Sequence, residues 1–205
     1  MIPTAIRRRR PWVTPTIIVI NVIVYLMWNG MADPEYMQRN FLCSWTRVEA
    51  GMYWTLLTTV FSHNMLWHIF INMFVLSSFG SFLESRLGSR RFLWLYLIAG
   101  ISASIVHCLT SAFLLNSPEL PALGASGAVA GIVATFAVLQ PQARILLFGI
   151  IPLPALVGVA LFVGLDLWGL VAQTQGGGLP LGHGAHLGGA FVGILYGLLQ
   201  KNSRR

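Results

Sequence analysis

Residues 183–197 read HGAHLGGAFVGILYG, and this stretch decides the architecture. Its glycines Gly189, Gly193 and Gly197 recur every four residues, so they form one smooth face of a helix. Such a face permits close contact with another helix rich in small residues, as in membrane proteins. Residues 124–139, GASGAVAGIVATFAVL, supply that partner through Gly127, Ala130, Gly131 and Ala134. The two stretches therefore predict a pair of tightly packed transmembrane helices.

The whole chain has the composition of a membrane protein. Of its 205 residues, 56% are hydrophobic and 9% are charged, whereas a soluble domain carries roughly 25% charged residues. We predict an all-α, polytopic bundle of six transmembrane helices, formed by the apolar segments 12–28, 61–83, 92–115, 124–139, 153–172 and 184–200. The membrane domain would span 12–200, between a basic N-terminal stretch (1–11) and a basic tail (201–205).

The distribution of Lys and Arg orients this bundle. With the N-terminus inside, eleven basic residues fall on the inner side and only Arg39 and Arg47 on the outer side. The inner set is Arg7, Arg8, Arg9, Arg10, Arg86, Arg90, Arg91, Arg144, Lys201, Arg204 and Arg205. Both termini are therefore expected in the cytoplasm, and loops 29–60, 116–123 and 173–183 outside. This pattern explains the net charge of +7 without a nucleic-acid partner.

Ser126 opens the fourth segment, which runs from outside to inside. About 16 residues give roughly 24 Å of helix, less than the hydrocarbon core of about 30 Å, so Ser126 is expected below the outer surface. The start of a helix leaves backbone N–H groups free, and these suit a developing oxyanion. The alternative is a helix-capping serine among small packing residues. The motif alone leaves both interpretations open.

His186 enters the sixth segment at a depth similar to that of Ser126 in the fourth. Because the two helices share small-residue faces, a nucleophile–base pair is a plausible interpretation. The alternative is a hydrogen-bonded packing histidine.

Polar residues also lie in the second and fifth segments. Asn64, His68 and Asn72 are spaced by four, so they share a helical face at the depth of Ser126 and suit oxyanion donors. Interhelical hydrogen bonding is the alternative. A metal site formed by His68, His183 and His186 is disfavoured, since no H-E-x-x-H motif is present.

Asp166 is expected to be structural, and the two cysteines are expected to be structural or incidental. Nothing in the sequence places Asp166 against His186, so we interpret it as a structural carboxylate near a helix end rather than as a triad member. Cys43 and Cys108 form neither a disulfide framework nor a metal pattern.

Four motifs together resemble the rhomboid intramembrane proteases over the transmembrane core, most closely a minimal bacterial type with six helices. They are Gly124-Ala125-Ser126-Gly127, Ala185-His186-Leu187-Gly188-Gly189 with Gly193, His68-Ile69-Phe70-Ile71-Asn72 and Glu84-Ser85-Arg86-Leu87-Gly88-Ser89. The resemblance implies a dyad without an acid, with Ser126 as nucleophile and His186 as general base. It implies an oxyanion hole of His68, Asn72 and the Ser126 backbone N–H. It also implies that loop 173–183 caps the site and that the fifth helix borders a lateral gate.

Two positions depart from the family pattern. Trp54-Thr55 stands where many members have Trp-Arg, and Ala130 stands where many place an aromatic residue against the catalytic imidazole. We therefore expect weaker support for the first loop and for the imidazole.

The expected activity is hydrolysis of peptide bonds in or near the outer part of transmembrane helices, with no metal or organic cofactor. The expected partners are transmembrane substrates and the lipid bilayer, in a bacterial inner membrane with the site open to the extracytoplasmic side. One alternative is a catalytically weak rhomboid-like protein that binds membrane clients. Another is a small transporter, which would show interrupted helices in two corresponding halves; the sequence shows none.

Overall fold

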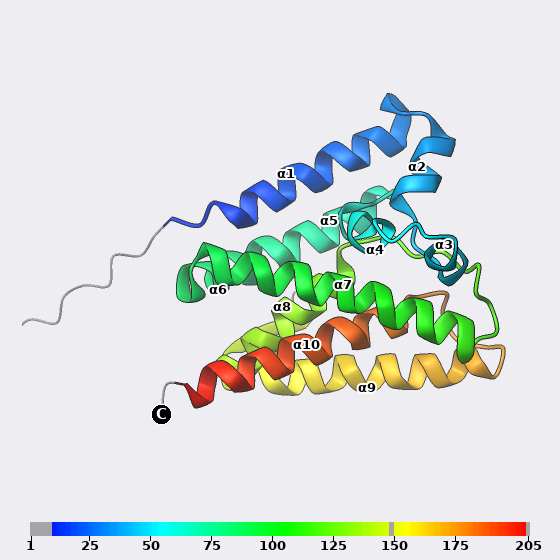
Figure 1. Ribbon diagram of the computed structural model, residues 1–205. Helices are drawn as coiled ribbons and strands as arrows, with labels where there is room; N and C mark the ends of the chain where they lie inside the picture. The colour runs from blue at the N-terminus through cyan, green and yellow to red at the C-terminus, as the bar shows by residue number, and fades with distance from the viewer. Residues whose placement is uncertain (1–9, 148–149, 204–205) are drawn as a thin grey trace, which may run out of the picture.

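The computed structural model describes residues 10–147 and 150–203, and within them the chain is almost entirely helical (Figure 1). The long helical stretches are α1 (Val13–Leu26) with a wide turn at Met27–Met31, α5 (Leu66–Val75) with Leu76–Gly80 and α6 (Ser81–Leu87), α7 (Ser89–Phe113), α8 (Ser126–Leu139), α9 (Ala155–Thr174) and α10 (His183–Asn202). Short helices α2 (Pro34–Phe41), α3 (Trp45–Glu49) and α4 (Thr55–Thr58), then a turn at Thr59–Phe61, fill the first loop. The six predicted segments all correspond to helices.

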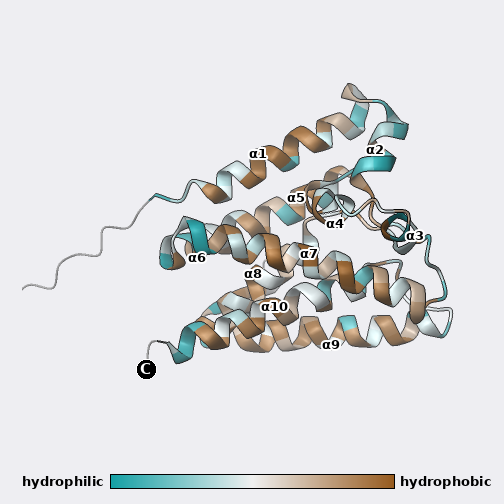
Figure 2. Cartoon of the chain, in the orientation of Figure 1, coloured by the Kyte–Doolittle hydropathy of each residue, from teal (hydrophilic) through white to brown (hydrophobic). Residues whose placement is uncertain are grey.

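Several of the helices have the length and hydropathy of membrane spans. Four stretches within the described residues qualify by both criteria, namely Val13–Met31, Leu66–Leu87, Ser89–Phe113 and Ala155–Thr174. Hydrophobic residues run along the helices, and hydrophilic ones gather toward the ends (Figure 2). The protein is therefore a multi-pass membrane protein with a nearly all-α fold, as predicted. At 14 residues, α8 is only about 21 Å long, so it cannot cross the bilayer core.

Helices α8 and α10 touch through their backbones. A Cβ atom added to Gly189 would lie 1.8 Å from the carbonyl oxygen of Gly127, and one added to Gly193 would lie 2.1 Å from that of Gly131. Thr135 Oγ1 donates a hydrogen bond across the same contact to the Gly193 carbonyl, at 2.9 Å. The small-residue contact predicted from the glycine spacing is thus confirmed.

Both ends of the described chain lie on one side of the bundle. The start of α1 and the end of α10 are at the same end in Figure 1, which is the arrangement that the Lys and Arg distribution requires. Arg7–Arg9 and Arg204–Arg205, which contributed to that prediction, lie outside the described residues.

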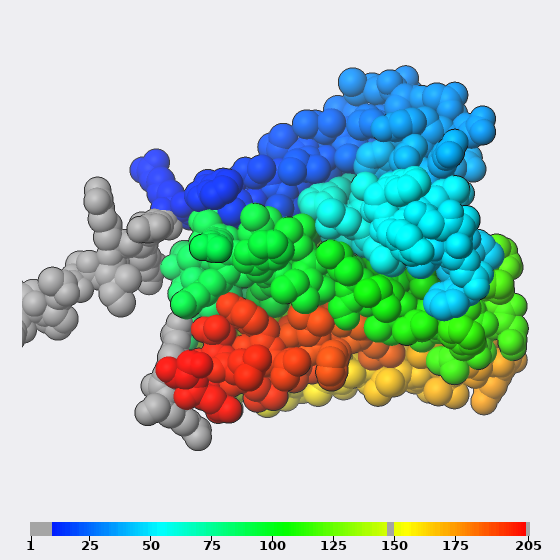
Figure 3. All heavy atoms as spheres, viewed as in Figure 1, coloured from blue at the N-terminus to red at the C-terminus, as the bar shows by residue number. Residues whose placement is uncertain are grey.

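The first loop is held firmly to the opposite end of the bundle, where it forms the upper right part of the face seen in Figure 3 (light blue to cyan). Cys43 and Ala122 exchange backbone hydrogen bonds of 3.0 and 2.7 Å, and Thr59 Oγ1 donates to the Ala122 carbonyl at 2.7 Å. Thr55 is fully buried and donates to the Met52 carbonyl at 2.7 Å. The loop therefore has firm anchorage although it has Trp54-Thr55 in place of Trp-Arg.

Glu84 binds the backbone at the start of α1. Its carboxylate accepts hydrogen bonds of 2.8–2.9 Å from the backbone N–H groups of Trp12, Val13 and Thr14. The hydroxyls of Thr14 and Ser89 donate to it at 2.8 and 2.6 Å. Since α1 has no side-chain cap of its own, Glu84 satisfies the free donors at its N-terminus.

A β-hairpin was missed by the sequence analysis. Strands β1 (Arg144–Leu147) and β2 (Ile151–Pro154) pair antiparallel immediately before α9. Two prolines are tolerated in β2 because the sheet has only two strands, so each strand has one edge that forms no ladder hydrogen bonds.

Candidate active site

Ser126 is the first residue of α8. Ala125 occupies the N-cap position and makes no side-chain capping bond, so the interpretation of Ser126 as a capping serine is wrong. The turn before it is held by Gly124, whose φ of +127° is a left-handed conformation that glycine adopts without strain. A Cβ atom there would also lie 2.6 Å from the His68 ring. The Ala125 N–H donates to His63 Nε2 at 3.3 Å, which orients the turn further.

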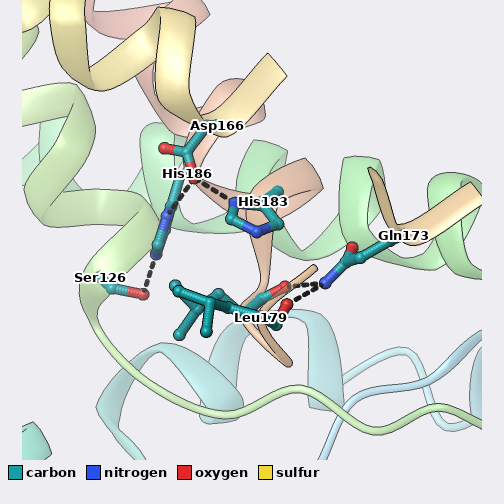
Figure 4. Close-up of polar contacts among 7 residues, drawn as sticks. Ser126, Asp166, Gln173, Leu179, His183 and His186 are labelled. Carbon is teal, nitrogen blue, oxygen red and sulfur yellow. Dashed lines mark hydrogen bonds and ion pairs between the residues drawn. The ribbon is translucent and has the colours of Figure 1, made fainter. Parts of the chain in front are cut away.

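His186 lies in the first turn of α10, directly opposite Ser126 (Figure 4). Its Nε2 is 3.0 Å from Ser126 Oγ, which is hydrogen-bond distance between a nucleophile and a base. The imidazole also has an aromatic neighbour although residue 130 is alanine. The Phe162 ring on α9 lies with its centroid 5.5 Å from that of His186. The His186 ring therefore has an aromatic contact, which comes from α9 rather than from position 130.

The proposed oxyanion donors reach the same space as Ser126. His68 and Asn72 lie one turn apart on α5, and both line the cleft that Ser126 and His186 line. One amide hydrogen of Asn72 is donated to the His68 carbonyl at 2.9 Å, and the second is left for another acceptor. Asn64 also lines the cleft but precedes α5, which begins at Leu66.

The cleft has a volume of about 1350 Å³ and extends along the whole of α8. Residues of α5, α6 and α9 form its walls, and Gln140 and Arg144 lie at its inner end. Apolar side chains dominate its lining between the two ends, and Ser126, His186, His68 and Asn72 gather at the outer end. The candidate reacting groups therefore share the outer end of the cleft.

Asp166 is the residue that the sequence analysis placed wrongly. It lies well inside α9 rather than at its end, it is buried, and its Oδ1 is 3.1 Å from His186 Nδ1 and 2.6 Å from His183 Nδ1 (Figure 4). The positional case that the sequence lacked is therefore present in the structure. The available signals were an aspartate inside an apolar helix and a second histidine three residues before His186.

The loop after α9 lies over the outer end of the cleft. Pro180, Leu181 and Gly182 line it, and Gln173 Nε2 donates to the carbonyls of Leu179 and Leu181 at 2.7 and 2.9 Å. The loop is thus fastened to the last turn of α9.

Comparison with known proteins agrees with this architecture. A family model described as Rhomboid domain matches residues 50–203. Rhomboid protein 1, mitochondrial, of Saccharomyces cerevisiae is 34% identical over 185 residues, which cover 87% of this chain and 50% of that protein. The human presenilin-associated rhomboid-like protein, mitochondrial, is 33% identical over 193 residues, covering 88% of this chain and 46% of that protein.

The chain spans about half the length of these curated relatives. RHOMBOID-like protein 12, mitochondrial, of Arabidopsis thaliana, at 30% identity over 191 residues, covers 87% of this chain and 55% of its own length. All three are named as mitochondrial, which counts against the expectation of a bacterial inner membrane. With the Rhomboid domain matched over most of its length, the chain belongs to the rhomboid family, whose members are generally intramembrane serine proteases.

Proposed function

We propose that this protein is an active intramembrane serine endopeptidase, with Ser126 as nucleophile and His186 as general base. The observation that carries the proposal is the 3.0 Å contact between Ser126 Oγ and His186 Nε2 at the outer end of a cleft lined mainly by apolar side chains. A histidine that only packs between helices does not require a serine hydroxyl within hydrogen-bond distance of its Nε2.

The reaction is acyl transfer to serine followed by hydrolysis. His186 Nε2 takes the Ser126 hydroxyl proton as Oγ bonds to the scissile carbonyl carbon, and it then returns the proton to the leaving amine. The oxyanion receives hydrogen bonds from the N-terminus of α8 and from His68 and Asn72. Water then attacks the ester, with His186 again as base, and releases the second product.

The substrate is a transmembrane segment of another protein. The cleft along α8 is lined by apolar side chains that suit such a segment, and the reacting groups lie only at its outer end. Cleavage therefore falls in the outer part of the substrate segment. Gly or Pro there aids cleavage, because these residues disfavour helix by about 1 and 3 kcal/mol relative to Ala and so expose the carbonyl.

The test is labelling of the purified protein with a fluorophosphonate, together with cleavage of a transmembrane substrate in detergent micelles. The wild type should be labelled on Ser126, and the Ser126→Ala and His186→Ala variants should neither react nor cleave. A substrate whose outer-half Gly and Pro residues are replaced by Leu should be cut more slowly. A folded wild type that fails both assays would instead be a client-binding rhomboid relative.

A further inference from the structure

Asp166 has two histidines of α10 on a single carboxylate oxygen. His183 Nδ1 is 2.6 Å and His186 Nδ1 is 3.1 Å from Asp166 Oδ1 (Figure 4). The Asp166 side chain is about 6% exposed and the His186 side chain about 16%. Both side chains are therefore largely shielded from water, and hydrogen bonds are stronger in such surroundings than in water.

This arrangement selects one tautomer of His186. An ionised carboxylate can only accept hydrogen bonds, so the hydrogen-bond network assigns a proton to Nδ1 of His186. The remaining nitrogen, Nε2, then has a free lone pair, and it is this nitrogen that lies 3.0 Å from Ser126 Oγ. A general base must present that tautomer to its nucleophile.

The facing side of α9 is shaped for these two imidazoles. Phe162, Asp166 and Gly169 are spaced by four and three, so they form one stripe of the helix. Phe162 contacts the His186 ring. At Gly169 a Cβ atom would lie 2.4 Å from Cε1 and Nε2 of His183, so only glycine leaves room for the ring that reaches Asp166. His183 in turn holds the carboxylate in place.

We propose that Asp166 is a positioning residue that completes a Ser126–His186–Asp166 triad, with His183 orienting the carboxylate. The proposal rests on the protease function proposed above and adds to it, since the family resemblance implied a dyad without an acid. As the Ser126 O–H bond breaks and Oγ bonds to the carbonyl carbon, His186 Nε2 gains the proton. Asp166 keeps its hydrogen bond with the Nδ1–H and so stabilises the resulting imidazolium. The same proton then passes from Nε2 to the leaving amine.

The experiment compares Asp166→Asn with wild type by kcat, KM, fluorophosphonate labelling rate and thermal unfolding in detergent. We expect kcat to fall by roughly 10²–10⁴-fold and labelling to slow in parallel, with KM within about threefold of wild type. If Asp166 only joined α9 to α10, the unfolding temperature would fall and kcat of the folded protein would remain.

Gly169→Ala gives a second test that keeps the carboxylate. It displaces His183, and we expect kcat to fall by roughly three- to tenfold, because Asp166 is then held less firmly. The matched control is Gly164→Ala on the same helix, where a Cβ atom would meet nothing within 4 Å. Should Asp166→Asn fail to fold, equal kcat in Gly169→Ala and Gly164→Ala would overturn the proposal.

The outcomes separate this proposal from the proposed function. A wild type that neither labels nor cleaves refutes the protease assignment itself. A wild type that does both, beside an Asp166→Asn variant with kcat within about threefold of it, refutes only the positioning role.

Discussion

Glu84 offers a sharp test of what holds the first helix in place. The Glu84→Ala change removes the acceptor for three backbone N–H groups at the start of α1 and for the hydroxyls of Thr14 and Ser89. The hydroxyls can rotate toward other acceptors. The N–H groups of Val13 and Thr14 are buried and cannot.

The expected loss follows from those two donors. Each buried donor left without a partner costs about 1–3 kcal/mol, and the lost charge at the helix N-terminus adds roughly 0.3–1 kcal/mol. We therefore expect Glu84→Ala to lower the free energy of unfolding by about 3–5 kcal/mol. Glu84→Gln should cost less, because its amide oxygen still accepts while its NH₂ group opposes the donors around it.

The assay is unfolding in mixed micelles with increasing SDS, followed by circular dichroism and by tryptophan fluorescence. Trp12, at the start of α1, gives the fluorescence signal access to this region. The control is Glu119→Ala, which alters an exposed carboxylate in a loop. If the free energy of unfolding of Glu84→Ala lies within about 0.5 kcal/mol of that of the control, the hydrogen bonds to Glu84 do not stabilise α1 and the reasoning fails.

Three further predictions test other parts of the molecule. If Asn72 and His68 bind the oxyanion, Asn72→Ala and His68→Ala should each lower kcat by as much as roughly 10²–10³-fold with little change in KM. A change confined to KM would show instead that they are packing residues. Cys43 Sγ lies 3.4 Å from Cys108 Sγ, and the hydrogen bond with Cys108 lowers the pKa of the Cys43 thiol. Oxidised glutathione should therefore convert the pair to a disulfide and release two molecules of reduced glutathione. Mass spectrometry after alkylation would detect it, and two alkylated cysteines would contradict it. Burial, and to a smaller extent the neighbouring His68, lowers the pKa of His63 to about 3 from its ordinary value of 6.5. The folded protein therefore favours the neutral imidazole, so the free energy of unfolding is highest above pH 6.5 and falls as the pH drops toward 3. At pH 5 the loss is about 2 kcal/mol, and it should vanish in His63→Gln when wild type and variant are unfolded in parallel.

The pairing of Ser126 with His186 could be predicted because each signal is local. Both residues open helices, and the glycine spacing alone brought the two helices together. The position of Asp166 could not be predicted in this way. Helix α9 is apolar on nearly all sides, so its sequence does not reveal which face meets α10. That rotation is set by packing, in which Gly169 makes room for His183.

The remaining differences also arise from tertiary contacts. Phe162 contacts the His186 ring although many family members have the aromatic residue at position 130, and it comes from a helix that the motif does not include. The prolines at 152 and 154 indicate a break in a helix but not the strand that they form with 144–147. The anchorage of the first loop depends on Ala122, which lies about 80 residues beyond Cys43 in the chain.

The glycine contact between α8 and α10 divides the site into two mechanical parts. The nucleophile and the base lie on helices whose backbones are in contact, and this contact holds the pair together. Asp166 and Phe162 lie on α9, whose contacts with His183 and His186 of α10 are made through side chains. If a substrate helix enters by displacing α9, the serine and the imidazole stay together while the carboxylate withdraws from the imidazole. The carboxylate contacts the imidazole again when α9 returns. The chemistry would then begin when the helices have closed around the substrate.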